Sequence, residues 1–478
     1  MSIERLPLAV DLDGTLIRTD LLHETATRFL VSRPFSAWRI IPWLLAGRAR
    51  LKSELASRTE LDVAALPYDQ DVLAWLRDEA TGGRQLALVS ASHESLVKAV
   101  ADHVGLFGLA LGSTAEHNLR SERKAAALAE RYGDHGFEYL GNHRHDLEVW
   151  DAAAVAHVAS GSDDLAKAVA ARTTLGRTFA SAGTPVTSLL HSARPHQWLK
   201  NLLVLVPLFT AQRMFDGYAV TAALSAFVAF CLVASSVYIL NDLADLDNDR
   251  HHPEKSSRSF AAGDASLLLG WALWPALVVL GFGLSLSVLP WVFTATLLCY
   301  FMITVAYTFI LKKLRVVDVM TLAALYTIRV IAGIAAISAD YSMWLLTFSL
   351  FLFLSLALVK RVSELTRARQ GSGEAKGRGY IHQDLEMLSS YGVASSMASA
   401  VIFALYLDDP ATSRLYATPE LLWGALPVLL TWLMRLWMLA HRGQIDEDPI
   451  LFAARDRWSL FAAVALAAVF VAAKVVTL

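Results

Sequence analysis

The chain has 478 residues, of which 55% are hydrophobic and 18% charged, and its formal net charge is −2. This length allows two or three domains, and the hydrophobic share is high for a soluble protein. The absence of a Lys/Arg tract that would neutralise phosphates excludes nucleic acid as an expected partner. Charges are spread evenly up to about residue 187, whereas long apolar stretches alternate with short charged loops from about residue 198. The composition therefore predicts a soluble domain followed by a membrane domain.

The first predicted element is a short buried strand, LAVD, which runs into the turn LDGT. This spacing places Asp11 and Asp13 at the carboxyl end of the strand, where ligands bind in open α/β sheets. A carboxylate there can attack phosphorus, and a second one two residues on can pass a proton to the leaving oxygen. An ordinary Asp-Gly turn is the alternative interpretation.

Two further predicted strands, LALVSAS and FEYLGNHRHD, also end in polar side chains. The first carries Ser90, whose hydroxyl suits a phosphate oxygen, and the second carries Asn142 and Asp146. Between them, Lys124 stands near the start of a predicted helix and supplies a cation that could neutralise a phosphoryl group. The pattern therefore favours phosphate chemistry at one edge of a sheet.

The order and intervals of these residues resemble the four motifs of haloacid dehalogenase (HAD) phosphatases. The resemblance implies an α/β HAD-like (Rossmannoid) domain over residues 1–180, with a helical cap at about 20–68. It implies that Asp11 is the nucleophile and Asp13 the acid/base, and that Ser90 and Lys124 bind the phosphoryl group. The Mg²⁺ ligands that it implies are Asp11, Asp13, Asn142 and Asp146.

One position departs from the HAD pattern. The family usually has an aspartate where this chain has Asn142. An amide oxygen can still bind Mg²⁺, but it brings no negative charge, so the affinity for the metal should fall. An active phosphatase and a weakened or silent domain both remain open.

The second half of the chain contains nine apolar stretches long enough to cross a membrane, which takes roughly 20 residues. They lie near 197–214, 219–241, 266–288, 290–311, 317–338, 342–360, 387–407, 419–440 and 458–477. The first is the weakest, because Pro207 and polar neighbours interrupt it. We therefore expect an all-α membrane domain of nine transmembrane helices over 194–478, joined to the first domain by a linker at 181–193.

Basic residues gather in alternate loops of this domain. Four loops, near residues 250–258, 312–315, 360–378 and 442–457, hold most of them, whereas the other set holds only Arg213 and Arg414. By the positive-inside rule, those four loops face the cytosol. We expect a multi-pass protein of the cell (inner) membrane, with a cytoplasmic N-terminal domain and the C-terminus outside.

An acidic motif, NDLADLDND, lies just after the second predicted span. If the helix continues, Asn241, Asp245 and Asp249 stack at i, i+4 and i+8, and Asp242 lies close to that face. Such oxygens suit Mg²⁺ bridging to a diphosphate, and polar residues at a membrane boundary are usually functional. A solvated acidic loop is the alternative.

This N-D-x-x-D-x-x-x-D spacing after the second span resembles the first aspartate motif of the UbiA superfamily of membrane prenyltransferases. Lys255 and Arg258, followed by FAAG, resemble its phosphate-binding loop. Tyr307, Lys312 and Asp318 match the Y-x-x-x-x-K…D region of its second cytosolic loop. The resemblance covers about residues 190–478 and implies that Asp245 and Asp249 are catalytic.

The residues after Asp318 indicate the branch of the superfamily. The fourth of them is Leu322, which breaks the second D-x-x-x-D motif of quinone and haem prenyltransferases. The segments SARPHQWLKNLLVLVPLF, NDLADLDNDRHHPEK and LKKLRVVDVMTLAALYTIRVIAG instead look like decaprenyl-phosphate phosphoribosyltransferases. That resemblance implies a polyprenyl phosphate acceptor, a 5-phosphoribosyl 1-diphosphate donor and Mg²⁺. The HAD-like domain would then remove the 5-phosphate from the lipid product.

Several basic and amide side chains offer donors for the phosphates of these substrates, namely Arg194, Lys200, Asn201, Lys255, Arg258, Lys312 and Arg329. Each basic residue also fits an anchor at the membrane interface. One rival function is prenyl transfer from a prenyl diphosphate to an aromatic acceptor, with a regulatory or inactive HAD domain. Rival functions of different classes are a transporter and a catalytically silent scaffold. The oligomeric state, a homo-oligomer included, stays open.

Overall fold

The computed structural model describes residues 5–180, 185–253, 255–370, 379–445 and 448–476. Its contacts divide the chain into two compact units, Met1–Ala193 with Tyr238–Trp274, and Arg194–Val237 with Pro275–Leu478. The segment with the acidic motif thus belongs to the same unit as the N-terminal domain. Of the predicted linker, residues 181–184 lie outside the described residues and the next form helix α9 (Pro185–Ser192).

A six-stranded sheet with the order β3-β2-β1-β4-β5-β6 forms the centre of the first unit, and its neighbouring strands pair in parallel. Its strands are β1 (Leu8–Val10), β2 (Leu86–His93), β3 (Leu109–Ser113), β4 (Glu138–Gly141), β5 (Val155–Ala159) and β6 (Thr174–Phe179). The central strand β1 is buried on both faces, which explains its uninterrupted apolar run. The predicted parallel α/β architecture is confirmed.

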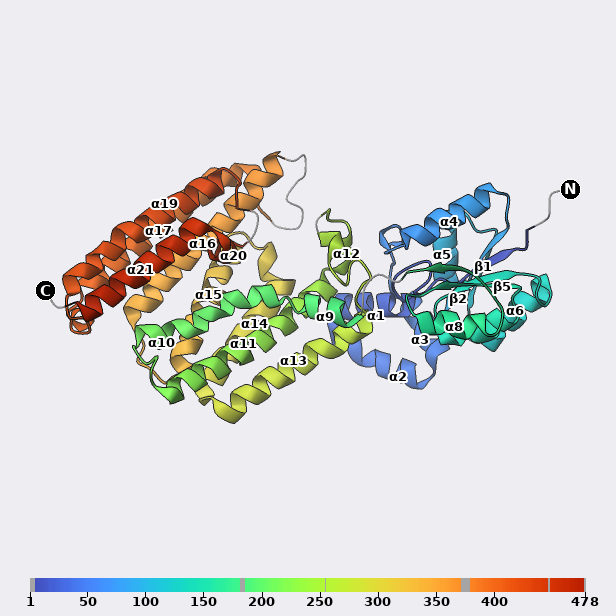
Figure 1. Ribbon diagram of the computed structural model, residues 1–478, viewed down its shortest axis with the longest axis horizontal. Coiled ribbons are helices and arrows are strands. Elements are labelled where there is room, and N and C mark those ends of the chain that lie inside the picture. The colour runs from blue at the N-terminus through green and yellow to red at the C-terminus, as the bar shows by residue number, and fades with distance from the viewer. Residues whose placement is uncertain (1–4, 181–184, 254, 371–378, 446–447, 477–478) are drawn as a thin grey trace. The chain divides into compact units, whose positions relative to one another are not determined.

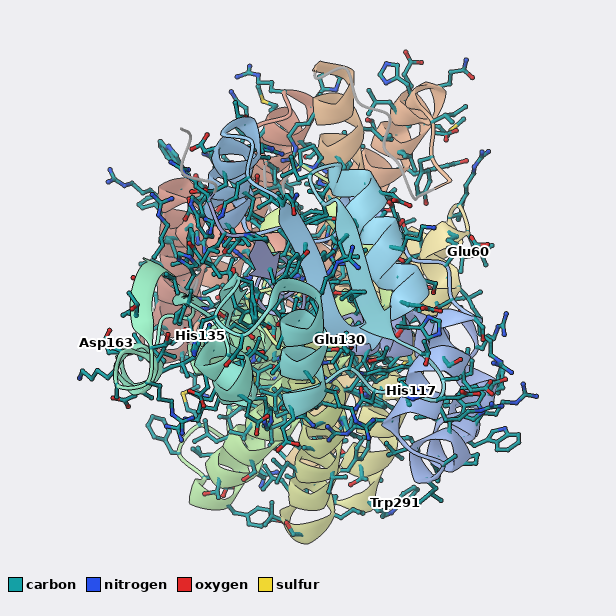
Figure 2. All side chains as sticks on the ribbon, turned by 90° about the vertical axis from the view of Figure 1, so that its right-hand side faces the viewer. Glu60, His117, Glu130, His135, Asp163 and Trp291 are labelled. Carbon is teal, nitrogen blue, oxygen red and sulfur yellow. The ribbon has the colours of Figure 1, made fainter. Side chains whose placement is uncertain are left out.

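Helices cover both faces of this sheet (Figure 1). One core contains Leu8 and Val10 of β1 with helices α4 (Gln70–Thr81) and α5 (Glu94–Val104). The other contains Ala9 with helices α6 (Glu122–Tyr132), α7 (Leu147–Asp151) and α8 (Asp163–Ala170). Charged side chains such as Glu130 and Asp163 lie on the outer surface (Figure 2).

Between β1 and α4 the chain forms a helical insertion, as the cap prediction expects. It comprises α1 (Leu21–Ser32), the 3-10 turn η1 (Pro34–Arg39), α2 (Ile40–Leu45) and α3 (Arg48–Ala56). Asp20 caps α1, because its carboxylate accepts the Leu22 N–H at 2.8 Å. Phe29, Leu51 and Leu55 give the insertion a small core of its own.

The second unit is helical. The described residues contain eight helical segments long and apolar enough to span a membrane. Their bounds are Gly217–Ala244 (α11), Leu267–Val288 (α13), Trp291–Phe309 (α14), Val317–Ala336 (α15), Met343–Arg367 within α16 (Met343–Gln370), His382–Asp408 with α17 (Leu385–Asp408), Pro419–His441 with α19 (Ala425–His441), and Arg457–Val475 (α21). Helices α11 and α13 cross the division between the two units.

The first predicted span, near 197–214, does not appear as a long α-helix. Its place is taken by the 3-10 segment η4 (Pro195–Leu205) and the short helix α10 (Val206–Thr210). Pro207 explains the break, because it lacks the N–H that a continuing helix needs and its ring clashes with the preceding turn. Nine transmembrane helices are therefore not confirmed.

Helices α15, α16 and α19 pack around the main apolar core of the second unit, which includes Tyr326, Leu356, Val362 and Trp437 (Figure 1). Glycine permits one close approach here. A Cβ added at Gly392 of α17 would lie 2.1 Å from the ring of Trp437. The tryptophan therefore fills the space that the missing side chain leaves.

Candidate active sites

The carboxyl ends of β1, β2 and β4 bring the predicted HAD residues together. Asp11 follows β1, and its Oδ1 accepts a hydrogen bond of 2.7 Å from Nζ of Lys124, which α6 supplies. The same ammonium group lies 3.7 Å from Oδ1 of Asp146. All three side chains are buried, so one cation is shared by two carboxylates in a region without bulk water.

Asp13 is held by a separate set of donors. Its Oδ2 accepts hydrogen bonds from the hydroxyls of Ser90 at 2.8 Å and Ser92 at 2.7 Å. Its Oδ1 accepts the backbone N–H of Leu21 at 2.8 Å, at the start of α1. The sequence pattern predicted Ser90 as a phosphate ligand, whereas in this geometry its hydroxyl orients the carboxylate of Asp13.

The fourth strand supplies Asp146 and Asn142. Asp146 accepts the Tyr139 hydroxyl at 3.0 Å and the backbone N–H groups of Asn142 and His143 at 3.2 and 3.1 Å. The amide group of Asn142 lies against Gly14, where a Cβ would approach Nδ2 to 2.1 Å. Gly14 has φ +73, which favours glycine. The departure from the HAD pattern therefore faces the loop that carries Asp11 and Asp13, the two predicted catalytic carboxylates.

Burial shifts the ionisation of this cluster. Burial raises the pKa of Asp11 to about 7, against the opposing attraction of Lys124. Burial also raises the pKa of Asp13, and the neighbouring Asp20 adds to that shift. For Lys124 burial lowers the pKa, but Asp11 and Asp146 outweigh it and the net pKa is raised. The three hydrogen bonds that Asp13 accepts lower its pKa and so oppose the effect of its burial.

Sequence reasoning missed three side chains of this site. Ser92 and Tyr139 complete the hydrogen bonds of Asp13 and Asp146. Lys52 of α3 donates to the carbonyl of Ala91 at 2.5 Å, between the two serines. The alternation of a strand signals Ser92, because residues two apart face the same side. Lys52 carries no such signal, since only the folded insertion brings it to β2.

The acidic motif begins at the end of α11 and continues into the short helix α12 (Leu246–Arg250). Hydrogen bonds of 2.8 Å run from the Asp245 N–H to the Asn241 carbonyl and from the Asp249 N–H to the Asp245 carbonyl. Helical hydrogen bonds therefore link Asn241, Asp245 and Asp249, although Asp245 itself lies between the end of α11 and the start of α12.

Arg258 joins two carboxylates of this motif. Its Nη1 donates to Asp242 at 3.2 Å and to Asp249 at 2.6 Å. Burial raises the pKa of Asp249, although the positive charges of Arg258 and Lys255 act in the opposite direction. The structure thus brings together Asp242, Asp249 and Arg258, which the sequence predicted as ligands of metal and phosphate.

The other side of α12 binds the cap helix α1, within the same compact unit. Arg250 donates to both carboxylate oxygens of the buried Glu24, at 3.0 and 2.6 Å. Arg28 donates to Glu24 at 2.6 Å and also pairs with Asp247. The acidic motif is therefore attached to the same helix whose first N–H holds Asp13.

In the second unit, polar side chains gather around Asp448. Its Oδ2 accepts Lys200 Nζ at 2.8 Å, the Tyr326 hydroxyl at 2.8 Å and Lys360 Nζ at 3.3 Å. Lys200 is a predicted phosphate ligand, whereas Asp448 was not predicted as a member of any site. Burial alone would raise the pKa of Asp448, but the two lysines outweigh it and hold that pKa below its usual range.

Two other predicted groups lie in this unit. The guanidinium of Arg329 donates to Asn201 Oδ1 at 3.0 Å and to the Tyr300 hydroxyl at 3.0 Å. Tyr307 donates to Asp318 at 2.7 Å, and both contact Arg361, which donates to Asp318 at 2.5 and 3.0 Å. Arg361 was missed, and its pairing occupies the carboxylate of Asp318.

The remaining predicted residues lie at the edges of these groups. Arg194 precedes η4 with φ 51, and Lys312 is half-buried in the turn Leu311–Lys313. Within the described part of the chain, no three acidic, histidine or cysteine side chains gather closely enough to hold a metal ion. The predicted magnesium ligands therefore remain predictions.

Comparison with known proteins identifies the helical part. The model of the UbiA prenyltransferase family matches residues 202–461, more than half of the chain. The chain belongs to the UbiA prenyltransferase family. Its family and its apolar helices make it a multi-pass membrane protein, while its membrane and orientation remain predictions.

Several known proteins are similar to this UbiA protein. It is 37% identical to the uncharacterized protein y4nM of Sinorhizobium fredii over 472 residues, 98% of this chain and 91% of that one. It is 37% identical over 201 residues to the decaprenyl-phosphate phosphoribosyltransferase of Mycolicibacterium smegmatis, covering 40% of this chain and 62% of that relative. A solved UbiA homologue from Archaeoglobus fulgidus, bound to GPP and Mg²⁺, aligns with a TM-score of 0.45 and 16% identity over 59% of this chain and 98% of its own.

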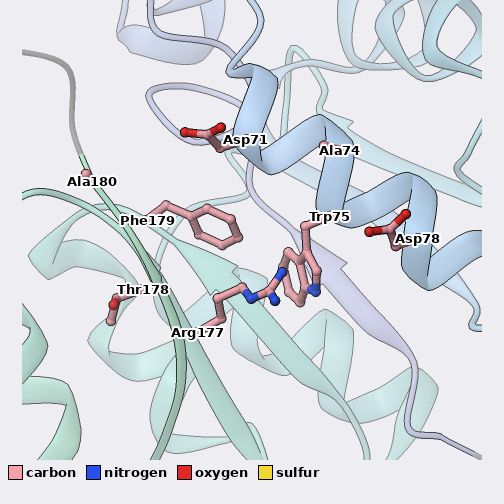
Figure 3. Close-up of a pocket in the computed structure, with 8 residues that line it drawn as sticks. All are labelled: Asp71, Ala74, Trp75, Asp78, Arg177, Thr178, Phe179 and Ala180. Carbon is pink, nitrogen blue, oxygen red and sulfur yellow. The ribbon is translucent and has the colours of Figure 1, made fainter.

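A pocket of 370 Å³ in this UbiA protein lies apart from the predicted residues, between α4 and β6 (Figure 3). Trp75, Arg177 and Phe179 line it, and the Arg177 guanidinium lies 5.6 Å from the Trp75 ring. Trp75 also packs on His157, with ring centroids 4.8 Å apart. None of the residues predicted for catalysis borders this pocket.

Proposed function

We propose that the protein joins polyprenyl phosphate to 5-phosphoribosyl 1-diphosphate and releases diphosphate. We further propose that the α/β fold then removes the 5-phosphate from the lipid product. The observation that carries the transfer reaction is the convergence of Asp242 and Asp249 on Arg258 at the end of a membrane helix. The UbiA family and the decaprenyl-phosphate phosphoribosyltransferase relative support it.

The chemistry of both carboxylate groups fits Mg²⁺. In each, two carboxylates already share one cationic side chain, Lys124 or Arg258, and hard oxygens are the ligands that Mg²⁺ prefers. The residues that would hold it are Asn241, Asp242, Asp245 and Asp249 in the motif, and Asp11, Asp13, Asn142 and Asp146 at the strand ends. When bound, it would supply positive charge to the departing diphosphate and to the phosphoryl group.

In the transfer step, a phosphate oxygen of the lipid attacks the anomeric carbon of the ribose. The bond between that carbon and the diphosphate breaks at the same centre, and the diphosphate leaves with the bonding electrons. Arg258 offers charged N–H donors to the diphosphate oxygens.

In the hydrolysis step, a carboxylate oxygen of Asp11 attacks the 5-phosphorus and the ester oxygen leaves with the proton of Asp13. Lys124, 2.7 Å from Asp11, neutralises charge on the phosphoryl oxygens. Water then cleaves the aspartyl phosphate, with Asp13 taking the proton of that water. The hydrogen bonds from Ser90, Ser92 and the Leu21 N–H keep Asp13 oriented for both roles.

The test is to incubate the purified full chain with Mg²⁺, polyprenyl phosphate and 5-phosphoribosyl 1-diphosphate, and to follow the lipids by mass spectrometry. We expect the ribosyl lipid from the wild type and the phosphoribosyl lipid from Asp11→Asn. We expect neither product from Asp245→Ala.

If the wild type forms neither lipid, the proposal is wrong. If it instead consumes an added prenyl diphosphate together with an aromatic acceptor, the rival prenyl transfer replaces it. A wild type that stops at the phosphoribosyl lipid would retain the transferase and refute the phosphatase half.

A further inference from the structure

The cap exposes an unusual run of large hydrophobic side chains. Among the described residues 5–180, the exposed large hydrophobic side chains are Phe35, Trp38, Ile41, Leu44 and Leu45, all within eleven residues of sequence. Phe35 is 96% exposed and Leu45 is 83% exposed. They lie on η1 and α2, and we call them the apolar patch. A contiguous patch of this kind on a folded domain marks an interaction site.

The segment that carries the patch is folded rather than loose. Trp43 of α2 packs against Phe29 of α1, with ring centroids 5.3 Å apart, and the Arg58 guanidinium covers it at 5.0 Å. Ile40 and Trp43 border the small core of Phe29, Leu51 and Leu55. One side of α2 is therefore anchored in the cap, and the apolar patch is what remains on the other side.

The charged residues along the segment that carries the patch are all of one sign. Arg33, Arg39 and Arg48 are exposed beside it, and no Asp or Glu occurs between Glu24 and Glu54. The Arg39 guanidinium lies 5.6 Å from the ring of Trp38. A protein partner of ordinary composition would not require an acid-free border, whereas an anionic lipid surface attracts this pattern.

We propose that the apolar patch inserts into the surface of an anionic bilayer, the bilayer in which the spans of this same chain lie. Aromatic and aliphatic side chains flanked by arginine are the composition of segments that lie in the interface of a membrane, where Trp prefers the headgroup level. At six residues, α2 is too short to cross the membrane.

The patch is connected to the catalytic carboxylates through α3. This helix packs on α2 and on β2, and its Lys52 donates to the Ala91 carbonyl at 2.5 Å, between the two serines that bind Asp13. A cap seated on the bilayer would hold the phosphatase site at the level of lipid headgroups. The preferred substrates are then phosphate esters carried on membrane lipids rather than soluble ones, an inference that rests on the proposed phosphatase step.

The first experiment measures the insertion directly and does not depend on catalysis. A spin label is placed at Leu45→Cys or Phe35→Cys in the full chain, with Cys299→Ser to remove the exposed native thiol, and at Glu130→Cys as a control on the outer surface of α6. The chain is reconstituted in nanodiscs with and without anionic lipid. We expect labels 45 and 35 to be accessible to oxygen and protected from a water-soluble nickel complex, and label 130 to show the reverse.

Equal accessibility of labels 45 and 130 to the nickel complex in anionic nanodiscs would overturn the proposal. Short distances between the labels of two copies, in discs that hold two chains, would also overturn it and assign the patch to a second copy.

The second experiment tests the consequence for substrates. Phe35→Ser with Leu45→Ser removes much of the apolar patch without touching the small core of the cap. We expect the KM for a lipid-linked phosphate ester in anionic vesicles to rise about tenfold, while hydrolysis of para-nitrophenyl phosphate keeps its kcat and KM. Equal effects on both substrates would contradict the inference, whereas a wild type without activity on either would refute the proposed phosphatase and leave the labelling result standing.

Discussion

Two pairs of carboxylates in this protein each share one cation, but their surroundings differ. Lys124, between Asp11 and Asp146, is 4% exposed and is supplied by a helix packed on the sheet. The side chain of Arg258, between Asp242 and Asp249, is 27% exposed and follows a short helix and a turn. Both pairs of carboxylates are buried, but the cation of the first pair is enclosed in the core, whereas the cation of the second pair reaches water.

This difference separates stability from activity. Removing the cation from a buried pair leaves uncompensated charge and is strongly destabilising. The guanidinium of Arg258 is partly screened by water, so its ion pairs should contribute less to folding than those of Lys124, although Asp242 and Asp249 are themselves buried. In the proposed transfer reaction, the guanidinium of Arg258 exchanges its carboxylate partners for a diphosphate with little loss of folding stability. Substitutions in the strand-end group (Asp11, Lys124 and Asp146) should therefore mainly lower the stability of the fold. Substitutions in the acidic motif and at Arg258 should mainly lower activity.

The largest expected effect comes from replacing one carboxylate in each group by an amide. Asp249→Asn removes one negative charge from the acidic motif, and we expect formation of the phosphoribosyl lipid to fall by about 10³-fold, the scale of losing one strong electrostatic contact to a transition state. Lipid products separated by mass spectrometry give the rate.

Asp11→Asn is the matched control, since it also replaces a carboxylate by an amide. We expect it to leave the rate of transfer unchanged and to stop removal of the 5-phosphate. If both variants lowered transfer equally, the division of labour between the two carboxylate groups would be wrong.

The second largest effect comes from removing the cation that each pair of carboxylates shares. Lys124→Met leaves Asp11 and Asp146 buried without their shared cation, and we expect a loss of about 3–5 kcal/mol in the stability of the α/β fold. Arg258→Met should cost less, about 1–3 kcal/mol, because Asp242 and Asp249 are buried but the guanidinium between them reaches water. Hydrogen exchange of β1 and β4 in the full chain measures the first, and exchange of the segment 246–253 measures the second.

Equal losses for the two variants would show that exposure does not distinguish these sites. A Lys124→Arg variant keeps the charge and should recover part of the stability, which separates loss of charge from a change in packing.

Local pattern was enough for much of this architecture. Buried runs such as LAV predicted the parallel strands, and polar residues at their ends predicted the gathering of Asp11, Lys124 and Asp146. Apolar length predicted the eight spanning helices in the described residues. It failed near 197–214, where composition allows a span but Pro207 interrupts the helix.

The charged residues that sequence analysis missed have partners that lie far away along the chain. Glu24 meets Arg250 across 226 positions, Lys200 meets Asp448 across 248, and Arg361 meets Asp318 across 43. No periodicity or motif relates such pairs, because tertiary packing alone brings them together. Their burial is what marks them, since an unpaired charge there would be costly.

The third effect concerns the affinity of the strand-end group for Mg²⁺. Asn142→Asp restores the acidic residue that HAD phosphatases usually have, next to Gly14. The added charge should strengthen attraction for Mg²⁺, and we expect the half-saturating concentration for phosphatase activity to fall about tenfold, in the range found when neighbours of a metal ligand change. Metal titrations with para-nitrophenyl phosphate measure it.

A half-saturating concentration that does not change would mean that Asn142 lies outside the metal site. Asn142→Ser, which leaves a smaller neutral oxygen, is the control and should not lower the concentration.

The smallest effect concerns an ion pair of the same sheet that has no part in either site. Glu138 accepts hydrogen bonds from His157 at 2.7 Å and pairs with Arg84 at 2.6 Å. Burial alone would raise its pKa, but these partners lower it from the ordinary value of 4.5. A carboxyl whose folded pKa is depressed contributes stability that is present above its unfolded pKa and lost as the pH falls through the folded pKa.

Glu138→Gln should therefore destabilise β4 and β5 by about 1–2 kcal/mol at pH 7, and the difference from wild type should shrink as the pH falls below 4.5. Hydrogen exchange of these strands at several pH values measures it, with Asp151→Asn, from an exposed ion pair with Arg172, as the control expected to show little change. A penalty for Glu138→Gln that stayed constant down to pH 3 would show that packing, rather than the charge of this carboxylate, stabilises the strands.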